Sequence, residues 1–359
     1  MPTDVQIRQF VLSDREALLA FLRTAYPDEP RRSEAAFWNW HFLDTPRAAT
    51  DELPLWIVKS GERIVGQLAT LPVELKAGAK SLRAIWLIDF IVDQALRGRG
   101  LGKQLVLTAR KSYPTMLSLG GTVQSIAVFR RLNWADLGHI RRYQKLLYPG
   151  NDLQKAASLR PLGTLVNFCY SPFRPRLSAS AKDDNLTVRE VFEFDDSFNA
   201  LWQTASTQWP CAVVRDAASL RWQFGKQPGK RYVVLGLFEQ EQLRGYAVLF
   251  FRKAEPGRKP AKASIADLCY SADASSAVID DLLRAALRLA LERRAGSLVT
   301  DVLDARVEER LKRLGFWRIR TAPQFMVSAT EERDLIYEPR NWFLTRGDSD
   351  VSIFEHPNL

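Results

Sequence analysis

Cysteine and histidine are scarce in this sequence, and both shortages limit its chemistry. The 359 residues include 3 cysteines, Cys169, Cys211 and Cys269. They lie too far apart for a zinc knuckle or a CxxC redox pair, and an odd number argues against a framework of disulfides. The 3 histidines are His41, His139 and His356. Because they are scattered along the chain, we expect structural histidines and no metal site.

Long hydrophobic runs are also missing. The most apolar segment, residues 84–92, is short and contains Asp89, whereas a membrane-spanning helix needs about 18 or more apolar residues. Residues 1–10 have neither the basic region nor the apolar region of a secretory signal. We therefore expect a soluble protein of the cytoplasm without a membrane span. The sequence has no GxSxG elbow and no cysteine–histidine motif, which argues against covalent catalysis.

Basic residues are in excess, but no nucleic-acid-binding motif accompanies them. Lys and Arg number 51 against 41 Asp and Glu, which gives a formal net charge of +10. The basic residues occur in scattered pairs rather than in one arm, so we do not expect nucleic acid as the partner. Such a charge attracts polyanions in general, including anionic membranes and phosphorylated small molecules.

The order of the predicted elements divides the chain into two units. Hydrophobic residues make up 46% of the sequence and charged residues 26%, as in globular proteins, and the length suits two domains. The pattern of residues 1–150 predicts a mixed α/β unit, and a similar order of strands and helices is predicted again for residues 186–335. Residues 151–185 have the proline and small polar residues of a linker. Residues 336–359 form a tail, in which residues 341–350 could pack as a strand or stay in solvent.

Three segments of the first half have counterparts in the second half, in the same order and at similar spacing. The pairs are 38–42 with 220–224, 87–90 with 265–268, and 130–134 with 312–316. The first pair is aromatic, with Trp40 matched by Trp222, and each member is followed by a proline. A repeated pattern of this kind predicts a duplicated structural unit.

A glycine-rich segment connects a strongly predicted strand to a strongly predicted helix. Its residues are Arg97, Gly98, Arg99, Gly100, Leu101 and Gly102. Free backbone N–H groups in the first turn of a helix converge on an anion, and glycine lets the backbone approach that anion closely. The two arginines can add positive charge. We therefore predict a phosphate-binding loop, although the segment is neither a Walker A motif nor a GxGxxG dinucleotide fingerprint.

This loop resembles the pyrophosphate loop of the GNAT superfamily of acyl-CoA-dependent N-acyltransferases, which follows the fourth strand and has the pattern Arg/Gln-x-x-Gly-x-Gly/Ala. The resemblance is clear over residues 5–147 and fainter over 186–330. It implies a mixed α/β fold of two GNAT-like units, each a mostly antiparallel sheet flanked by helices. It also implies acetyl-CoA or another acyl-CoA as co-substrate. The aromatic segments of the repeat are similar to those of GNAT-like proteins from bacterial exopolysaccharide gene clusters.

Two positions depart from the family pattern. Residues 271–277, which align with the loop in the second half, have no glycine or arginine and contain Asp273, so we expect no CoA there. Phe129 stands where the family often has a tyrosine that protonates the departing CoA thiolate. Either another acid serves, with Tyr113 and Tyr143 as candidates, or catalysis is weak.

Asp89 is the candidate general base. It is the one charge within residues 86–92, a run otherwise suited to a buried strand. Acylation needs a deprotonated amine, and burial disfavours the charged form of a carboxylate, which makes it a better base. The alternatives for Asp89 are a structural hydrogen bond or an exposed position on the strand. Asp267 occupies the repeated position, which favours a role linked to the fold.

These observations predict an acyl-CoA-dependent N-acyltransferase, most simply an N-acetyltransferase, whose first unit binds the cofactor and whose second unit shapes the acceptor site. The acceptor would be the amine of a small molecule or an amino sugar. Two alternatives stay open. One is a non-catalytic GNAT-like binding protein in polysaccharide assembly. The other is an aminoacyl transferase similar to the FemABX proteins, which fits the duplicated fold and the basic charge but leaves the CoA-type loop unexplained.

Overall fold

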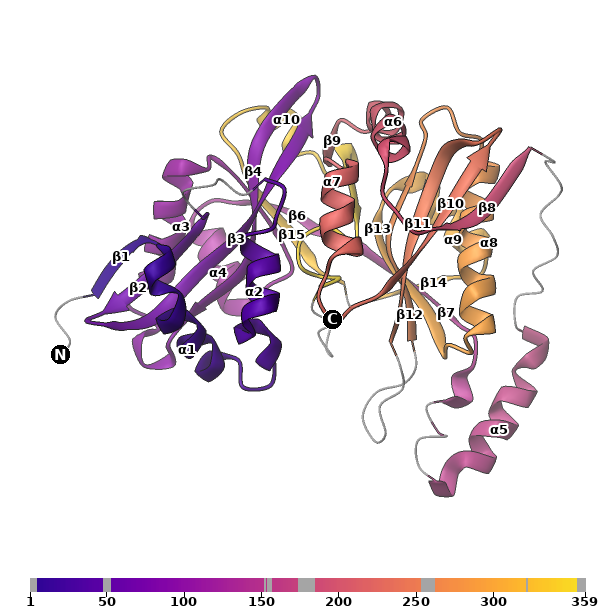
Figure 1. Cartoon of the computed structure of the whole chain (residues 1–359), viewed down its shortest axis with the longest axis horizontal. Coiled ribbons are helices and arrows are strands. Elements are labelled where there is room, and N and C mark those ends of the chain that lie inside the picture. Colours follow the sequence, from indigo (N-terminus) through magenta and orange to yellow (C-terminus); the bar gives the residue numbers. More distant parts are fainter. Residues whose placement is uncertain are drawn as a thin grey trace.

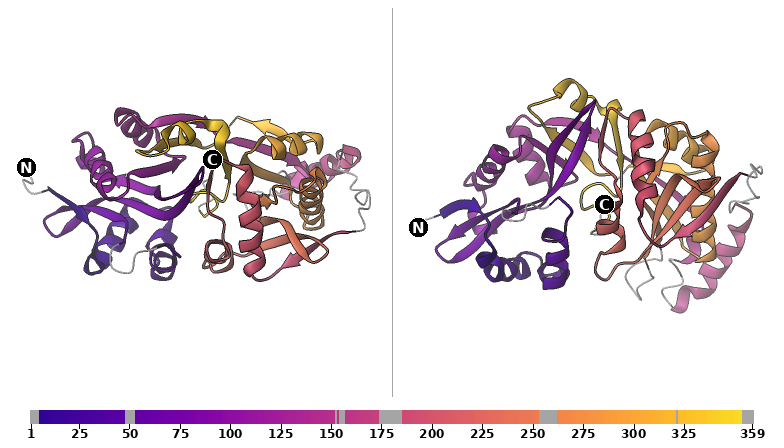
Figure 2. Two further views of the ribbon diagram at one scale, coloured as in Figure 1. Left: turned by 90° about the horizontal axis from the view of Figure 1, so that it is seen from above. Right: turned by 45° about the horizontal axis from the view of Figure 1, so that its top comes forward.

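Two lobes, each a sheet with helices packed on it, lie side by side in the computed structural model of this chain (Figure 1). The structure describes residues 5–47, 53–151, 153, 157–173, 185–252, 262–320 and 322–353. Figure 2 shows the same two lobes from two other directions. The helices are α1 (Arg15–Ala25), α2 (Ala35–Phe42), α3 (Leu101–Ser112), α4 (Val123–Arg131), α5 (Arg160–Cys169), α6 (Asp196–Ala205), α7 (Ala217–Leu220), α8 (Ser276–Glu292), α9 (Ala305–Arg313) and α10 (Arg333–Ile336).

The sheet of the first lobe is covered by helices on both faces. Its strands, in order across the sheet, are β1 (Val5–Gln9), β2 (Leu55–Ser60), β3 (Arg63–Ala77), β4 (Lys80–Val92), β5 (Thr115–Leu119), β15 (Gln324–Ser328) and β6 (Ala135–His139). Ile57 packs against α1 and α2, whereas Val58 packs against α3. Successive side chains of a strand point to opposite faces, so the unbroken apolar run in β2 reflects burial on both sides.

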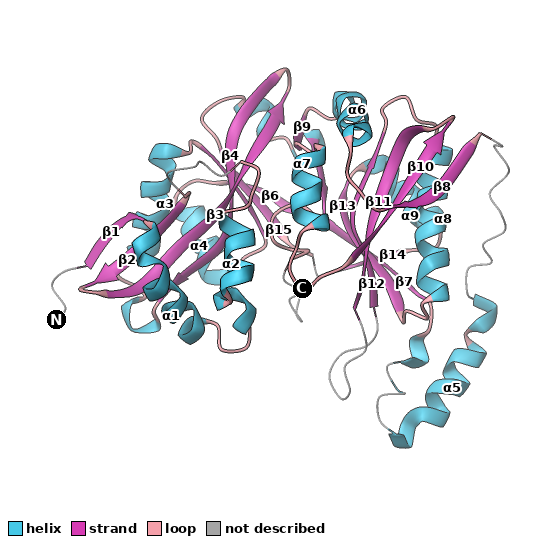
Figure 3. Ribbon diagram, in the orientation of Figure 1, coloured by secondary structure: helices cyan, strands magenta, loops and turns pink. Residues whose placement is uncertain are grey.

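The sheet of the second lobe repeats this order of strands (Figure 3). Its strands are β8 (Leu186–Val191), β10 (Tyr232–Glu239), β11 (Gln242–Arg252), β12 (Lys262–Tyr270), β13 (Ser297–Leu303), β7 (Arg141–Leu146) and β14 (Trp317–Ile319). The pairs β4–β5 and β12–β13, at corresponding places in the two sheets, are both parallel. The predicted fold class, two GNAT-like units with mostly antiparallel sheets flanked by helices, is confirmed.

The two sheets exchange one strand each. Residues 135–146 form two consecutive strands, β6 and β7, which are separated by Ile140, and only β6 stays in the first sheet. β7 lies in the second sheet between β13 and β14, and β15 lies in the first sheet between β5 and β6. The ranges 1–150 and 186–335 are therefore not self-contained in space, because each contributes a central strand to the other sheet.

Two further strands connect the sheets through interior strands of each. β9 (Cys211–Val213) pairs with β3 of the first sheet, and β16 (Trp342–Thr345) pairs with both β9 and β13. All four side chains of β16 are buried. The tail segment that was predicted either to pack as a strand or to stay in solvent thus packs as a strand between the lobes.

The predicted linker contains a helix, and the described helices leave no candidate for a membrane span. α5 and the short 3₁₀ helix η7 (Ser171–Phe173) lie within residues 151–185. None of the helices in the described part of the chain combines the length and the apolar character that crossing a membrane requires.

Candidate functional site

The six residues of the predicted phosphate loop lie together at the N-terminus of α3, directly after β4. Gly100 is the N-cap of the helix with φ 80°, and Gly98 has φ 81°. Both backbones are in the left-handed region, which disfavours residues with a Cβ, and the space where a Cβ would point is open at both positions. The first four N–H groups of a helix have no partner within the helix. The positive end of the helix dipole adds to these groups and favours an anion.

Gly102 serves the packing of the helix rather than the loop conformation. A Cβ at this position would lie 2.9 Å from Cζ of Phe90 on β4. The absence of a side chain therefore lets the first turn of α3 approach the end of β4 closely. Leu105, Val106 and Ala109 then bury the apolar face of α3 against the sheet.

The arginines of the loop supply positive charge at its rim. The Arg97 Nε–H donates a hydrogen bond of 3.0 Å to the carbonyl oxygen of Val92, which folds this side chain back over the end of β4. Arg99 is exposed. Arg97 also lines a cavity of about 500 Å³ between α1 and the ends of β3 and β4, together with Phe21 and Ile91. No local pattern in the sequence indicates this cavity, because the residues that line it come from elements far apart in the chain.

Strands β4 and β5 separate halfway along their length. Their parallel pairing runs from Ala84 with Thr115 to Trp86 with Leu117 and ends there. Beyond Trp86, β4 continues to Val92 with β3 as its paired neighbour. The edge of β4 that faces away from β3 thus continues past β5 and leads to the predicted phosphate loop at the start of α3.

Asp89 lies at an irregularity of β4 and forms a buried ion pair. The register with β3 shifts between the pairs Leu68–Phe90 and Thr70–Leu87, which places Asp89 in a bulge. Asp89 is 5% exposed, and its Oδ1 accepts a hydrogen bond from Arg32, which is 4% exposed. Burial alone would lower the pKa of Arg32, but the charge of Asp89 raises it above its ordinary value. Of the two alternatives to a general base, the exposed position does not apply, because Asp89 is buried, and the structural hydrogen bond is present. The role of Asp89 as general base stays a prediction.

Neither Phe129 nor the two tyrosines considered as general acids contacts Asp89 in the described contacts. Phe129 is buried in a stack with Phe90 and Trp134, at ring-centroid distances of 6.0 and 4.6 Å. Tyr143 belongs to β7 in the second sheet, where its hydroxyl donates a hydrogen bond of 2.8 Å to Glu308. Burial and this bond raise the pKa of Tyr143 above its ordinary value. Tyr143 is thus a core residue of the other lobe. Tyr113 packs edge-on against Trp56 at the end of α3.

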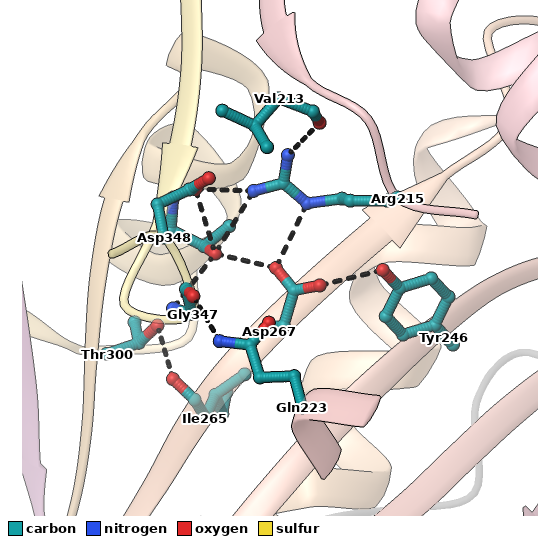
Figure 4. Close-up of polar contacts among 10 residues, drawn as sticks. Val213, Arg215, Gln223, Tyr246, Ile265, Asp267, Thr300, Gly347 and Asp348 are labelled. Atoms are coloured by element: carbon teal, nitrogen blue, oxygen red, sulfur yellow. Dashed lines mark hydrogen bonds and ion pairs between the residues drawn. The ribbon is translucent and has the colours of Figure 1, made fainter. Parts of the chain in front are cut away.

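The second lobe contains a counterpart of the Asp89 ion pair. Asp267 lies beside a register shift of β12, and its Oδ1 is 3.3 Å from Nε of Arg215 (Figure 4). Its other carboxylate oxygen accepts a hydrogen bond of 2.7 Å from the hydroxyl of Tyr246. Both Asp267 and Arg215 are buried. An arginine precedes each aromatic segment of the repeat, and this was the signal in the sequence that could have identified Arg32 and Arg215 as the partners.

The chain itself fills the region of the second lobe where β12 and β13 separate. Their parallel pairing ends at Ile265 with Thr300, and β16 then pairs with β13. The loop that follows β16 brings Asp348 to Arg215 at 2.5 Å and places Gly347 beside the bulge, where Gln223 donates to its carbonyl oxygen (Figure 4). This half therefore has the ion pair and the separated strands, but its own C-terminal segment lies between them.

The second lobe also has an acid in place of a phosphate loop. Asp273 lies between the end of β12 and the start of α8, where its carboxylate forms an ion pair of 2.9 Å with Arg244. The hydrogen bond from Ser271 and the charge of Arg244 lower the pKa of Asp273 below its ordinary value. A negative charge at this place disfavours a second anion.

The comparisons with known proteins agree with this geometry. Residues 15–134 match the family model described as acetyltransferase (GNAT) family. N-myristoyltransferase of Saccharomyces cerevisiae, in a structure with bound myristoyl-CoA, is 13% identical with a TM-score of 0.61; the match covers 91% of this chain and 83% of that one. A probable N-acyltransferase from Enterococcus faecalis V583 is 12% identical with a TM-score of 0.62, covering 92% of this chain and 74% of that one.

A GCN5-related N-acetyltransferase from Anabaena variabilis is 13% identical with a TM-score of 0.60, covering 90% of this chain and 72% of that one. No curated protein matches the sequence. At these identities the structural likeness shows the fold, and the family match adds the sequence pattern of the first unit. Residues 15–134 thus match the GNAT family in sequence, and the whole chain is similar in fold to these N-acyltransferases.

Proposed function

We propose that this protein is an acyl-CoA-dependent N-acyltransferase that binds one acyl-CoA, in its first lobe. The observation that carries the proposal is the loop at the N-terminus of α3, where Gly98 and Gly100 adopt left-handed backbone conformations with open space at their Cβ positions, beside first-turn N–H groups that have no partner within the helix. These groups would hold the pyrophosphate of CoA, with Arg97 and Arg99 neutralising charge at the rim. The second lobe, with Asp273 at the corresponding place and β16 between its strands, would bind no cofactor.

The chemistry then follows from the free edge of β4. A thioester lying along this edge would receive backbone N–H groups at its carbonyl oxygen, which carries the negative charge of the tetrahedral intermediate. The amine attacks the carbonyl carbon, a new C–N bond forms, and the C–S bond to CoA breaks. The attacking amine loses a proton and the thiolate gains one. The acceptor would be a small-molecule amine or an amino sugar, as expected for a protein of polysaccharide assembly, and the acyl group acetyl or longer.

Calorimetry with acetyl-CoA, CoA and a long-chain acyl-CoA tests this proposal. We expect heat of binding with a stoichiometry of one per chain. Gly100→Asp should abolish it, because a side chain and a negative charge would enter the pyrophosphate site. Gly138→Asp is the matched control, since Gly138 also has φ in the left-handed region and open space around it, but lies on β6. Absence of heat with every CoA species, or equal effects of the two substitutions, would contradict the proposal.

A non-catalytic binding protein is the second candidate, and two observations favour it. Phe129 provides no proton for the thiolate and is enclosed in an aromatic stack, and the Asp89 carboxylate is paired with Arg32. An assay of CoA release with a panel of amines and amino sugars distinguishes the candidates. Binding of acyl-CoA without acceptor-dependent CoA release would support the second, and release well above hydrolysis would support the transferase.

A further inference from the structure

Large apolar side chains are exposed together on α5 and η7. Among the described residues, this short region between the two repeated units exposes five of them, in contrast to their scattered occurrence elsewhere. They are Leu159, Leu162, Leu165, Phe168 and Phe173, with relative exposures of 40, 47, 56, 75 and 73%. Leu162, Leu165 and Phe168 follow one another at intervals of three residues, which places them on one side of α5. Leu159 and Phe173 belong to the short 3₁₀ helices directly before and after it. A contiguous exposed apolar face of this kind marks an interaction surface.

The apolar face of α5 points outward because a polar face holds the helix to the protein. The buried residues of α5 are Gly163 and Asn167. The Asn167 side chain accepts a hydrogen bond of 2.8 Å from the N–H of Gly150 and donates one of 2.9 Å to Asn151. A Cβ at Gly150 would overlap the carbonyl oxygen of Gly163, so the helix lies directly against the backbone there. α5 lies at the outer edge of the second lobe (Figure 1), with its apolar side chains away from the core.

The charge of this region has one sign. Residues 155–176 contain Lys155, Arg160, Arg174 and Arg176 and no acidic residue. The whole chain carries a formal net charge of +10. Of these four basic residues the structure describes Arg160, at the start of α5. An apolar helix face within a basic stretch of sequence combines the two contributions that bind a protein to the surface of an anionic bilayer, namely burial of apolar side chains and attraction to the headgroups.

We propose that α5 and η7 dock this protein on an anionic membrane surface, with the apolar face at the level of the headgroups and without crossing the bilayer. Charge argues against a second copy of the chain as the occupant. A symmetric contact through α5 would bring the basic residues of two copies together, and like charges repel. This proposal does not depend on the proposed acyl transfer.

Vesicle binding tests the docking surface, and the chain provides its own reporter. Cys169 on α5 is exposed, whereas Cys211 and Cys269 are buried, so an environment-sensitive fluorophore on the native protein labels α5. We expect co-sedimentation and a blue shift of the label with vesicles of phosphatidylcholine and phosphatidylglycerol, but neither with phosphatidylcholine alone. Added salt should weaken the binding.

Substitutions on α5 should remove this binding. Leu165→Glu and Phe168→Glu should each weaken it about tenfold or more, because each removes a large apolar group from the interface and adds a negative charge. Leu12→Glu is the matched control, since Leu12 is 61% exposed but lies in the first lobe, and it should bind as the original protein does. Calorimetry with acyl-CoA on the same variants keeps this result separate from the cofactor site.

Two results would overturn the proposal. One is absence of binding to anionic vesicles, or binding that Leu165→Glu and Phe168→Glu leave unchanged. The other is a dimer in solution, measured by light scattering without vesicles, that these two substitutions dissociate. The apolar face would then be an interface between copies of this chain.

Discussion

Trp40 and Trp222 form a reciprocal pair at the contact between the lobes. Their rings stack with a centroid distance of 5.1 Å and an interplanar angle of 16°. The Trp40 Nε1–H donates to the carbonyl oxygen of Trp222 at 2.9 Å, and the Trp222 Nε1–H donates to the carbonyl oxygen of Trp40 at 2.8 Å. Each residue plays the same part toward the other, as expected when two similar units meet about a local twofold axis.

Trp40→Phe and Trp222→Phe should each lower the free energy of unfolding by about 1–3 kcal/mol. Each substitution keeps most of the apolar area but leaves one buried carbonyl oxygen without its donor. The loss of unfolding free energy in the double variant should differ from the sum of the two single losses by a coupling energy of about 0.5–3 kcal/mol, because the residues are in direct contact. Urea unfolding of the four proteins measures this coupling. Additive effects would show that the two tryptophans contribute independently.

Asp89→Asn should reduce stability by up to about 3–5 kcal/mol, because the buried charge of Arg32 would keep only the partly exposed Glu29 as an ionic partner. Asp267→Asn is the matched substitution in the second lobe, where Arg215 keeps Asp348 as a second partner, so its loss should be smaller. Thermal or urea unfolding measures both. Affinity for acyl-CoA should change little in either variant.

The same pair of variants tests Asp89 as the general base. A positioned base contributes roughly 10²–10⁴ to turnover. If Asp89→Asn loses turnover by such a factor at an unchanged melting temperature and acyl-CoA affinity, while Asp267→Asn does not, then Asp89 is the base and its role as a structural partner of Arg32 is secondary.

Stability should fall as the pH drops below about 6.5, and His41 is the cause. This side chain is fully buried, and burial, together with the charges of Arg32 and Arg31, lowers its pKa to about 3. Between these two values the unfolded chain binds a proton that the folded protein does not, so acidification favours unfolding by about 1.4 kcal/mol per pH unit.

His41→Phe removes this titration and keeps a ring at the position. Urea unfolding at about pH 7.5 and pH 5 should show a loss of about 2 kcal/mol from His41 in the original protein, and the variant should lack this part of the loss. An identical pH dependence in both proteins would show that other groups cause it.

Asp348→Ala should loosen the C-terminal segment. Arg215 is fully buried and would lose one of its two carboxylate partners, which should cost about 3 kcal/mol or more. We expect faster proteolysis within residues 342–353 and a lower melting temperature. Acyl-CoA affinity should not change, because the phosphate loop lies in the other lobe. A new second binding site for acyl-CoA would show that this segment blocks one.

Local patterns in the sequence were sufficient to predict most helices and strands and the glycine-rich loop between β4 and α3. The strand before Arg97 and the apolar spacing after Gly100 predict the turn that β4 and α3 form, because glycine, strand and helix signals are all local. The repeat predicted that Asp89 and Asp267 would occupy corresponding places, and both lie at irregularities of β4 and β12.

The contacts between distant segments could not be predicted in this way. β6 and β7 are separated by Ile140 alone, and only their pairing partners show that they belong to different sheets. Arg32, the partner of Asp89, is distant from it in sequence. Asp348 lies among polar residues near the C-terminus, a pattern typical of a solvated tail, and only the structure shows that it is buried against Arg215.

The strand exchange makes the two lobes a single cooperative unit. Unfolding of the first lobe would displace β6 and, with it, the adjoining β7, which lies between β13 and β14 in the second sheet. Unfolding of the second lobe would in the same way remove β15 from its place between β5 and β6 in the first sheet. A chain with two independent domains would melt in two steps. This one has no boundary along which half of its structure can be lost while the other half survives, so a nick within the segment between the halves would leave them interlocked.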